Sequence, residues 1–286
     1  MKNILVTGGN GQLSTCLKKV GEEHKDLNFL YVSSDQLDIT DGSAVNAFFK
    51  ENEISHCVNC AAYTAVDKAA TEILQATKVN VDGAKNLAEA CKLYDTVLIH
   101  ISTDFVFDGE KSSLYSEIDK ANPVSVYGRT KLEGEVAIAD SWKKHVIIRT
   151  SWLYSEFGDN FLKTMLRLGR ERDSLGVVAD QIGTPTYAID LAKVIVAFIN
   201  IKSIDFGVYH YSNEGVASWY DFAEAIFEIS KTKVELSPIK TEAYPTPAKR
   251  PAFSVMDKSK IKSNLGIKIP YWRKSLRECL LIINSF

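Results

Sequence analysis

The sequence lacks an excess of either charge, long apolar runs and an N-terminal secretion signal. Its 34 Lys and Arg residues against 36 Asp and Glu residues give a formal net charge of −2, too little positive charge to attract nucleic acid or an anionic membrane. No apolar run reaches the roughly 18 residues that a membrane-spanning helix needs, and the run at 194–199 has the size of a core segment. The apolar stretch at the N-terminus is too short for a signal peptide. We therefore expect a cytoplasmic protein that binds a small molecule, with neither nucleic acid nor membrane as partner.

Cysteine and histidine are scarce and irregularly spaced. The five Cys residues are an odd number without the spacing of a disulfide framework, which favours free thiols in a reducing compartment. Cys57 and Cys60 form a C-x-x-C pair, but they lie in the apolar run 57–62, where we expect a buried strand rather than a redox site. The five His residues show no ligand spacing, so the sequence predicts no metal site.

What is present is an alternation of short β-branched runs and longer helical stretches in the first half of the chain. This alternation is typical of parallel strands joined by helical crossovers. The expected strands are residues 3–7, 28–32, 56–59, 96–102 and 145–150. The expected helices are residues 12–23, 43–51, 70–93, with a possible break near Val81, and 125–140.

Beyond residue 150 the alternation loosens. Helices are expected at 160–172, 188–200 and 218–230, and strands at 175–179 and 207–212. The proline-rich stretch 238–251 predicts an extended loop that could form the wall of a site. We therefore predict an α/β fold with two parts. A Rossmann-type, doubly wound parallel sheet would occupy residues 1–150, to which helix 188–200 would return, and a smaller α/β substrate-binding lobe would lie mainly in residues 151–286.

A glycine-rich turn follows the first strand, in the sequence T-G-G-N-G-Q-L-S at residues 7–14. Glycine at positions 8 and 11 lets the backbone approach a pyrophosphate, whose charge would rest on the N-terminus of the next helix. The spacing departs from G-x-G-x-x-G, and Ser14 stands where a third glycine would ease the packing of helix on strand. Taken alone, the motif is also compatible with an ordinary glycine turn.

Tyr127 and Lys131 are four residues apart on an expected helix and therefore share a face. A nearby ammonium stabilises a phenolate, so Lys131 is expected to lower the pKa of Tyr127 and to make it a usable acid. Hydroxyls at 102–103 end one expected strand, and Trp152 follows the next. Ligands of open α/β sheets bind at the edge where these strands end.

In this order the motifs resemble the extended short-chain dehydrogenase/reductases. The motifs are T-G-x-x-G-x-x (7–13), N-C-A-A-Y-T-A-V-D (59–67), V-N (79–80), S-T-D (102–104), Y-x-x-x-K (127–131) and R-T-S-W (149–152). Within that family the chain is most similar to the dTDP-4-dehydrorhamnose reductases, in residues 11–13, 62–69, 102–109 and 180–186. The resemblance covers about residues 2–256 and weakens in the last thirty residues.

The resemblance implies an NAD(P)H-dependent oxidoreductase of nucleotide-sugar and cell-surface polysaccharide biosynthesis, which reduces the C4 ketone of dTDP-4-dehydro-L-rhamnose to dTDP-L-rhamnose. It implies Thr103, Tyr127 and Lys131 as catalytic residues. NADPH or NADH would be held by Gly8, Gly11, Gln12, Leu13, Asp38, Ile39, Ala61, Ala62, Tyr63, Tyr127 and Lys131. The dTDP-linked 4-ketosugar would meet Val66, Thr103, Asp104, Trp152, Gln181 and Arg250. Arg250 could grip a diphosphate or be a solvated loop charge.

The chain departs from the family pattern at three positions. Ser14 and Cys60 are small residues in place of small residues, whereas Cys16 stands where some relatives carry a glutamate associated with magnesium. The resemblance also leaves open a non-catalytic regulatory subunit, as for methionine adenosyltransferase, a reductase of another nucleotide-linked 4-ketosugar, and a homodimer. Because Thr103, Tyr127 and Lys131 are all present, the sequence favours the enzyme.

Overall fold

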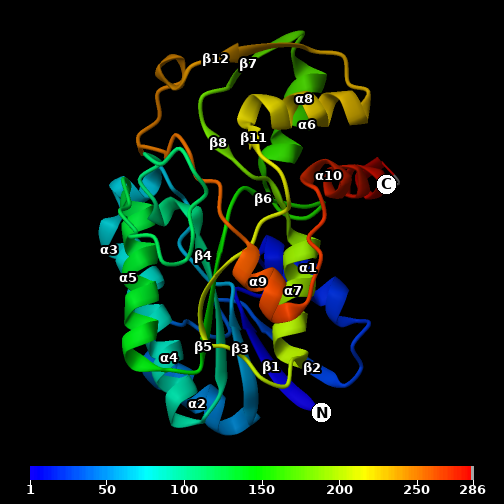
Figure 1. The fold of residues 1–286 in the computed structure, drawn as a ribbon. Helices are drawn as coiled ribbons and strands as arrows, with labels where there is room; N and C mark the ends of the chain where they lie inside the picture. The colour runs from blue at the N-terminus through cyan, green and yellow to red at the C-terminus, as the bar shows by residue number, and fades with distance from the viewer. Residues whose placement is uncertain (285–286) are drawn as a thin grey trace.

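A six-stranded parallel sheet forms the centre of the molecule in the computed structural model, which describes residues 1–284 (Figure 1). Along the sheet the strands lie in the order β10-β5-β4-β3-β1-β2, and every neighbouring pair is parallel. Their bounds are β1 (Lys2–Thr7), β2 (Leu27–Val32), β3 (Ile54–Asn59), β4 (Val97–Thr103), β5 (His145–Thr150) and β10 (Gly207–His210). Because β2 and β3 lie on opposite sides of β1, the order in which strands are added to the sheet reverses at β1. Ligands of such sheets bind at this point.

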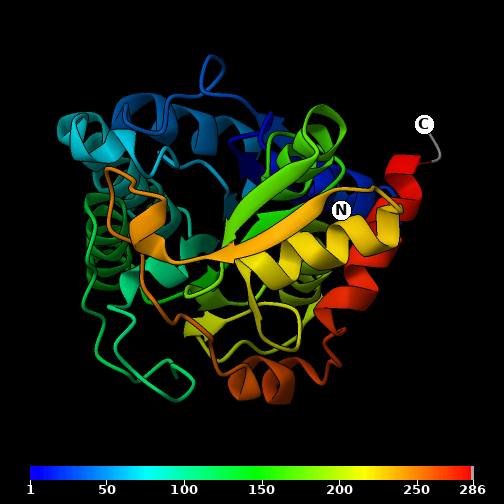
Figure 2. The same cartoon turned by 90° about the horizontal axis from the view of Figure 1, so that it is seen from above.

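The remaining strands lie beyond residue 150, above the large sheet in Figure 1. A parallel pair, β7 (Ser174–Val178) and β12 (Glu235–Ile239), lies next to α8 (Trp219–Ser230), as Figure 2 shows from above. Two short pairs complete this part: β6 (Leu153–Tyr154) with β9 (Thr186–Tyr187), and β8 (Ile182–Gly183) with β11 (Ala217–Ser218). The helices in this part of the chain are α6 (Phe161–Glu171), α7 (Ala188–Asn200), α8, α9 (Ser259–Leu265) and α10 (Trp272–Asn284).

Helices cover both faces of the large sheet. On one face, Ile4 and Val6 of β1 pack in a cluster with α1 (Gln12–Gly21) and α7. On the other face, Leu5 packs with residues of α2 (Gly42–Asn52), α4 (Ala84–Leu93) and α5 (Val126–Ser141). Because successive residues of a strand point to opposite faces, a strand covered on both sides must be apolar throughout. This confirms the predicted doubly wound fold.

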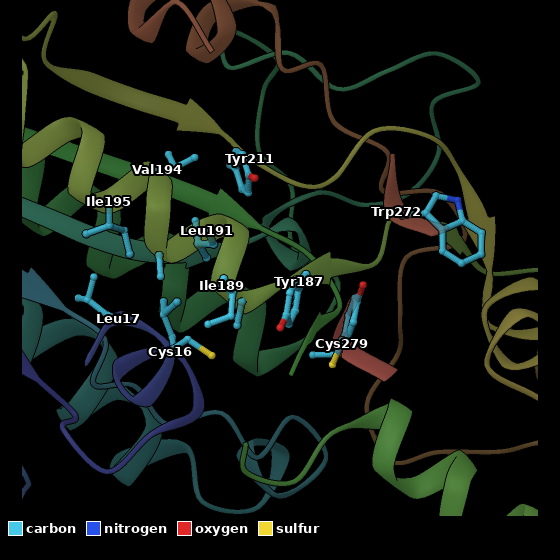
Figure 3. Packing of buried hydrophobic residues seen from close by; sticks show 14 of the residues in the cluster. Cys16, Leu17, Tyr187, Ile189, Leu191, Val194, Ile195, Tyr211, Trp272 and Cys279 are labelled. Atoms are coloured by element: carbon cyan, nitrogen blue, oxygen red, sulfur yellow. The ribbon is translucent and has the colours of Figure 1, made fainter. Parts of the chain in front are cut away.

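Helix α7 packs on α1, although the strands from β2 to β9 lie between them in the chain (Figure 3). Cys16 and Leu17 of α1 face Leu191 and Ile195 of α7 in Figure 3, and all four side chains are fully buried. Residues 194–199 of α7 are apolar because almost every face of this helix meets the core.

The predicted helix 70–93 is interrupted near Val81, as expected. A 3-10 turn (Lys68–Ala70) and α3 (Ile73–Thr77) lead into a π-helical segment (Lys78–Gly83) before α4. The side chain of Asn80 accepts a hydrogen bond from the Tyr63 amide and donates one to Thr130, so it ties the π-helical segment to two neighbouring segments.

The structure corrects one sequence prediction and adds two features that the sequence analysis did not place. The stretch 238–251 is not a loop throughout, since Pro238 lies within β12; an edge strand tolerates a residue without an N–H. Residues 207–210 form the sixth strand of the large sheet, so the chain beyond residue 150 contributes to both parts. Helices α9 and α10 were not predicted.

Candidate active site

A cavity of about 1030 Å³ lies over the carboxyl ends of the parallel strands. Its walls include Gly8 after β1, Ala61 after β3, Thr103 at the end of β4 and Trp152 after β5. Parallel strands end at one edge of the sheet, so segments that are far apart in the sequence meet here. The volume is at the upper end of the range for small-molecule sites and suits a long ligand or two ligands side by side.

Most residues that sequence analysis selected line this one cavity. They are Gly8, Gly11, Gln12, Leu13, Asp38, Ile39, Ala61, Ala62, Tyr63, Val66, Thr103, Asp104, Tyr127, Lys131, Trp152 and Arg250. Gln181 is the exception, because it is not part of the lining and its amide donates a hydrogen bond to Thr241 Oγ1 at 3.1 Å.

The cavity also contains residues that sequence analysis did not assign to it. They include Ser33, Ser34, Gln75, Phe105, Gly158, Asp159 and Trp219. Trp219, the first residue of α8, stacks on Trp152 with the ring centroids 3.6 Å apart and the planes at 8°. Trp152 has a φ of +47°, and a Cβ on Gly183 would lie 2.7 Å from its ring, so that glycine leaves room for the indole. No local sequence pattern predicts the contact between Trp152 and Trp219, because the two residues lie far apart in the chain.

The glycine turn brings backbone close to backbone. Gly8 has a φ of +66°, and a Cβ there would lie 2.8 Å from the amide nitrogen of Ala61. Helix α1 then begins after Gly11 without a side-chain cap, so the amides of its first turn have no such partner. A turn that only glycine can form, followed by free helix amides, fits a pyrophosphate.

Tyr127 lies in the first turn of α5, which Ser125 caps by accepting a hydrogen bond from the Gly128 amide. Burial raises the pKa of the phenol to about 12, although Thr103 acts in the opposite direction. The pKa of Tyr127 is therefore raised, with burial as the largest cause, where sequence analysis expected a lowered pKa.

Lys131 lies one helical turn further along α5, with only 2% of its surface exposed. Its Nζ donates to the Ile101 carbonyl oxygen at 2.8 Å and lies 3.2 Å from His100 Nε2. Burial lowers its pKa from the usual 10.5 to about 8, although the carboxylate of Glu135 acts in the opposite direction.

Asp104 is a buried carboxyl group beside this pair. It accepts hydrogen bonds from Ser254 Oγ at 2.6 Å and from Thr103 Oγ1 at 3.2 Å. Burial raises its pKa to about 6. The bond from Ser254 ties the C-terminal segment of the chain to the end of β4.

Arg250 is neither free nor fully solvated. Its Nη2 lies 2.9 Å from Asp67 Oδ2 and its Nη1 lies 3.2 Å from Oδ1, in a two-pronged ion pair. The hydrogen bond and charge of Arg250 lower the pKa of Asp67. This pair connects the segment after β3 with the proline-rich loop and leaves Arg250 in the cavity wall.

The Arg of the R-T-S-W motif, Arg149, does not line the cavity but supports it from behind. It forms a buried ion pair with Glu135, at 2.7 Å between Nη2 and Oε2, and Ser102 donates to the same carboxylate. Glu135 is one turn beyond Lys131 on α5, so this pair anchors the helix that carries Tyr127 to strands β4 and β5.

Within residues 1–284, no group of three or more His, Cys, Asp and Glu side chains is placed to hold a metal ion. Cys16 lies in the core between α1 and α7 and its thiol pKa is raised to about 12 by burial. No helix of this described part is long and apolar enough to cross a membrane.

Comparisons with known proteins agree with this geometry. The family model described as RmlD substrate binding domain matches residues 1–284. The dTDP-4-dehydrorhamnose reductase of Aggregatibacter actinomycetemcomitans is 42% identical, over 97% of this chain and 98% of that protein. This chain belongs to the dTDP-4-dehydrorhamnose reductase family.

Solved structures from this family have the same fold. A dTDP-4-dehydrorhamnose reductase of Clostridium acetobutylicum superposes with a TM-score of 0.95 at 42% identity, and the match covers 99% of each chain. The structure of the Bacillus anthracis dTDP-4-dehydrorhamnose reductase in complex with NADP superposes with a TM-score of 0.93 at 38% identity, over 99% of this chain and 100% of that one. The family resemblance and the fold class predicted from the sequence are thereby confirmed.

Proposed function

We propose that this chain reduces the C4 ketone of dTDP-4-dehydro-L-rhamnose to dTDP-L-rhamnose, with NADPH or NADH as the reductant. The observation that carries the proposal is the position of Thr103, Tyr127 and Lys131 in one cavity with the glycine turn. Relatives that are 42% identical over nearly their whole length bear the name of this reaction.

The residues present fit a dinucleotide along one side of the cavity. The turn at Gly8 and the first amides of α1 would hold the pyrophosphate. Asp38 and Ile39 lie further along the lining and would meet the adenine, while Lys131 would hold the ribose hydroxyls beside the nicotinamide. When bound, the reduced nicotinamide supplies the hydride.

The chain's own residues supply the proton. Reduction puts negative charge on the C4 oxygen, which must be stabilised and then protonated. A phenol with a pKa of about 12 carries its proton at neutral pH, as a proton donor must, and Thr103 lines the same cavity. Tyr127 would give the proton, Thr103 would orient the ketone, and the ammonium of Lys131 would stabilise the phenolate that remains.

The sugar nucleotide would lie on the other side of the cavity, against Val66, Asp104, Trp152 and Arg250. The flat face of an indole can cover a sugar or a base, and stacking on Trp219 keeps the ring of Trp152 in one orientation. Arg250 would meet the diphosphate while Asp67 orients its guanidinium group. Gln181 has no place in this arrangement.

We further propose that the two parts of the chain bind different ligands. Residues 1–150 with α7 would bind the cofactor, and residues 151–286 would mainly bind the substrate. In support, the glycine turn belongs to the first part, whereas Trp152, Trp219 and Arg250 belong to the second. A cytoplasmic location and a homodimer stay predictions.

The test is a spectrophotometric assay of NADPH oxidation with dTDP-, UDP- and GDP-linked 4-ketosugars. We expect turnover of the dTDP-linked 4-keto-rhamnose substrate. Tyr127→Phe should lower kcat by about 10²–10⁴-fold and leave the NADPH dissociation constant within about twofold, because only the proton is removed. A preference for a UDP- or GDP-linked sugar would indicate another 4-ketosugar reductase. NADPH binding without oxidation by any of these sugars would contradict the enzyme and favour the regulatory subunit.

A further inference from the structure

His100 of β4 lies directly behind the cavity and is one of the most deeply buried polar residues, with 1% of its surface exposed. It does not line the cavity itself. Its imidazole lies between two partners, Asn59 at the end of β3 and Lys131 of α5. A buried side chain with one ring nitrogen against a catalytic lysine can act on the reaction through that lysine.

The contacts form a continuous chain across three strands. Thr7 Oγ1 donates to Asn59 Oδ1 at 2.7 Å, Asn59 Nδ2 lies 2.9 Å from His100 Nδ1, and His100 Nε2 lies 3.2 Å from Lys131 Nζ. All four side chains have at most 2% of their surface exposed. Water therefore does not compete for these contacts, and each polar atom must be paired within the protein.

The amide of Ala61 indirectly determines which ring nitrogen of His100 carries the hydrogen. The Ala61 N–H can only donate, and its acceptor is Asn59 Oδ1 at 3.1 Å, so the amide orientation of Asn59 is determined. Asn59 Nδ2 then donates to His100 Nδ1, which must carry a lone pair. In the neutral ring the hydrogen is on Nε2, the nitrogen that faces Lys131.

This N–H favours the neutral form of the lysine. An ammonium has only donors, so an N–H that points at it is repulsive, whereas a neutral amine has a lone pair that can accept. The imidazole remains neutral, because burial holds the pKa of His100 well below its usual value and the charge of Lys131 acts in the same direction.

Other titratable groups also surround this contact. On α5, the carboxylate of Glu135 favours the ammonium form of Lys131, and Tyr127 lies one turn away. After β3, Cys60 raises the pKa of Lys131, as Glu135 does. On β5, His145 acts on His100. None of these groups directs an N–H at Lys131 Nζ. In the described structure, Nζ contacts the Ile101 carbonyl oxygen and His100 Nε2, and of these two only His100 can present an N–H.

We propose that His100 is a positioning residue for Lys131: its Nε2–H, oriented by Asn59, faces Nζ, favours the neutral amine and so sets the pH at which the lysine loses its proton and activity declines. The inference rests on the proposed function, in which Lys131 acts as an ammonium. It is not a proton relay, because Nδ1 only accepts and the Asn59 amide beyond it does not pass a proton on.

The variant His100→Asn separates the two contacts of the ring. The shorter amide can still accept from Asn59, but it places no group at Nζ. The matched control is His56→Asn on β3, since His56 is also buried, with 8% of its surface exposed, and does not line the cavity. For each protein, kcat and the NADPH dissociation constant are measured as functions of pH.

We expect the wild-type kcat to decline as pH rises through about 8, where Lys131 loses its proton. In His100→Asn this decline should move to higher pH by about one pH unit, because a contact that favours the neutral amine is gone. The alkaline weakening of NADPH binding should move by the same amount, while His56→Asn should follow the wild type in both measurements. An unchanged profile in His100→Asn, a move to lower pH, or an equal move in both variants would overturn the proposal.

Two measurements keep the inference separate from variant folding and from the proposed function. In wild-type protein with ¹⁵N-labelled histidine, NMR should show His100 neutral with its hydrogen on Nε2 at neutral pH, and a hydrogen on Nδ1 would refute the argument. If the wild type binds NADPH but reduces no ketosugar, the proposed function fails, whereas the pH dependence of NADPH binding still decides the role of His100.

Discussion

Replacing Lys131 with methionine is expected to abolish reduction and, at the same time, to stabilise the ligand-free protein. Lys131 is almost fully buried, and burial lowers its pKa from 10.5 to about 8. One pKa unit corresponds to about 1.4 kcal/mol, so the protonated side chain costs the folded state roughly 3 kcal/mol when both states carry the proton.

Methionine is an unbranched side chain without this charge, so it removes the cost and fills much of the same space. The substitution also removes the charge-assisted hydrogen bond from Nζ to the Ile101 carbonyl oxygen, which is worth about 2 kcal/mol. The balance is a gain of about 1 kcal/mol in the free energy of unfolding. At roughly 2–4 °C per kcal/mol for a protein of this size, Tm should rise by about 2–4 °C.

The sign of the pH dependence follows from the lowered pKa. Below pH 8 the wild type bears the full cost, because folded and unfolded chains are both protonated. Between pH 8 and 10.5 the folded protein has lost the proton that the unfolded chain still binds, so the wild type becomes more stable as pH rises. The stability advantage of Lys131→Met should therefore shrink over this interval.

The assay is thermal unfolding of ligand-free protein, followed by circular dichroism in steps from neutral pH to about pH 10. Lys92→Met on α4, where the lysine is exposed, is the control and should leave Tm and its pH dependence unchanged. A Lys131→Met protein that melts below the wild type at neutral pH, or an advantage that persists at alkaline pH, would refute the reasoning.

Three further predictions follow from the site. Trp152→Ala should lower kcat/KM by at least about tenfold per folded molecule, as measured by kinetics and circular dichroism; a lower Tm with unchanged kinetics would mean that the indole serves packing only. Gly128→Ala should lower stability by about 2–3 kcal/mol in denaturant unfolding, because the new Cβ would lie 2.1 Å from the Phe105 carbonyl oxygen; unchanged stability would contradict this packing. NADPH and NADH should give kcat/KM values within about tenfold, since Ser33 and Ser34 rather than an acid or a base follow β2; a ratio above about a hundred, near 2.7 kcal/mol, would exclude tolerance.

The sequence alone determined the elements whose cause is local. The strands β1 to β5 were predicted within about two residues because a strand covered on both faces is a short apolar run between breakers. The glycine turn and the spacing of Tyr127 and Lys131 could be predicted for the same reason, since each is a pattern of a few consecutive residues. Parallel topology then brings the strand ends together, and this is why most of the selected residues line one cavity.

Only the tertiary structure decided the contacts between segments that are distant in the chain. The structure pairs Arg250 with Asp67, whereas the sequence left two roles open for Arg250. It also stacks Trp152 on Trp219, a residue that sequence analysis did not assign to the site. It also adds residues 207–210 to the large sheet and excludes Gln181 from the cavity. The role of His100 depends on an Ala61 amide that orients the side chain of Asn59, and no periodic pattern records such a hydrogen bond. The periodicity of a sequence indicates which side of a helix or strand is buried. Only tertiary packing determines which atoms of other elements contact that side.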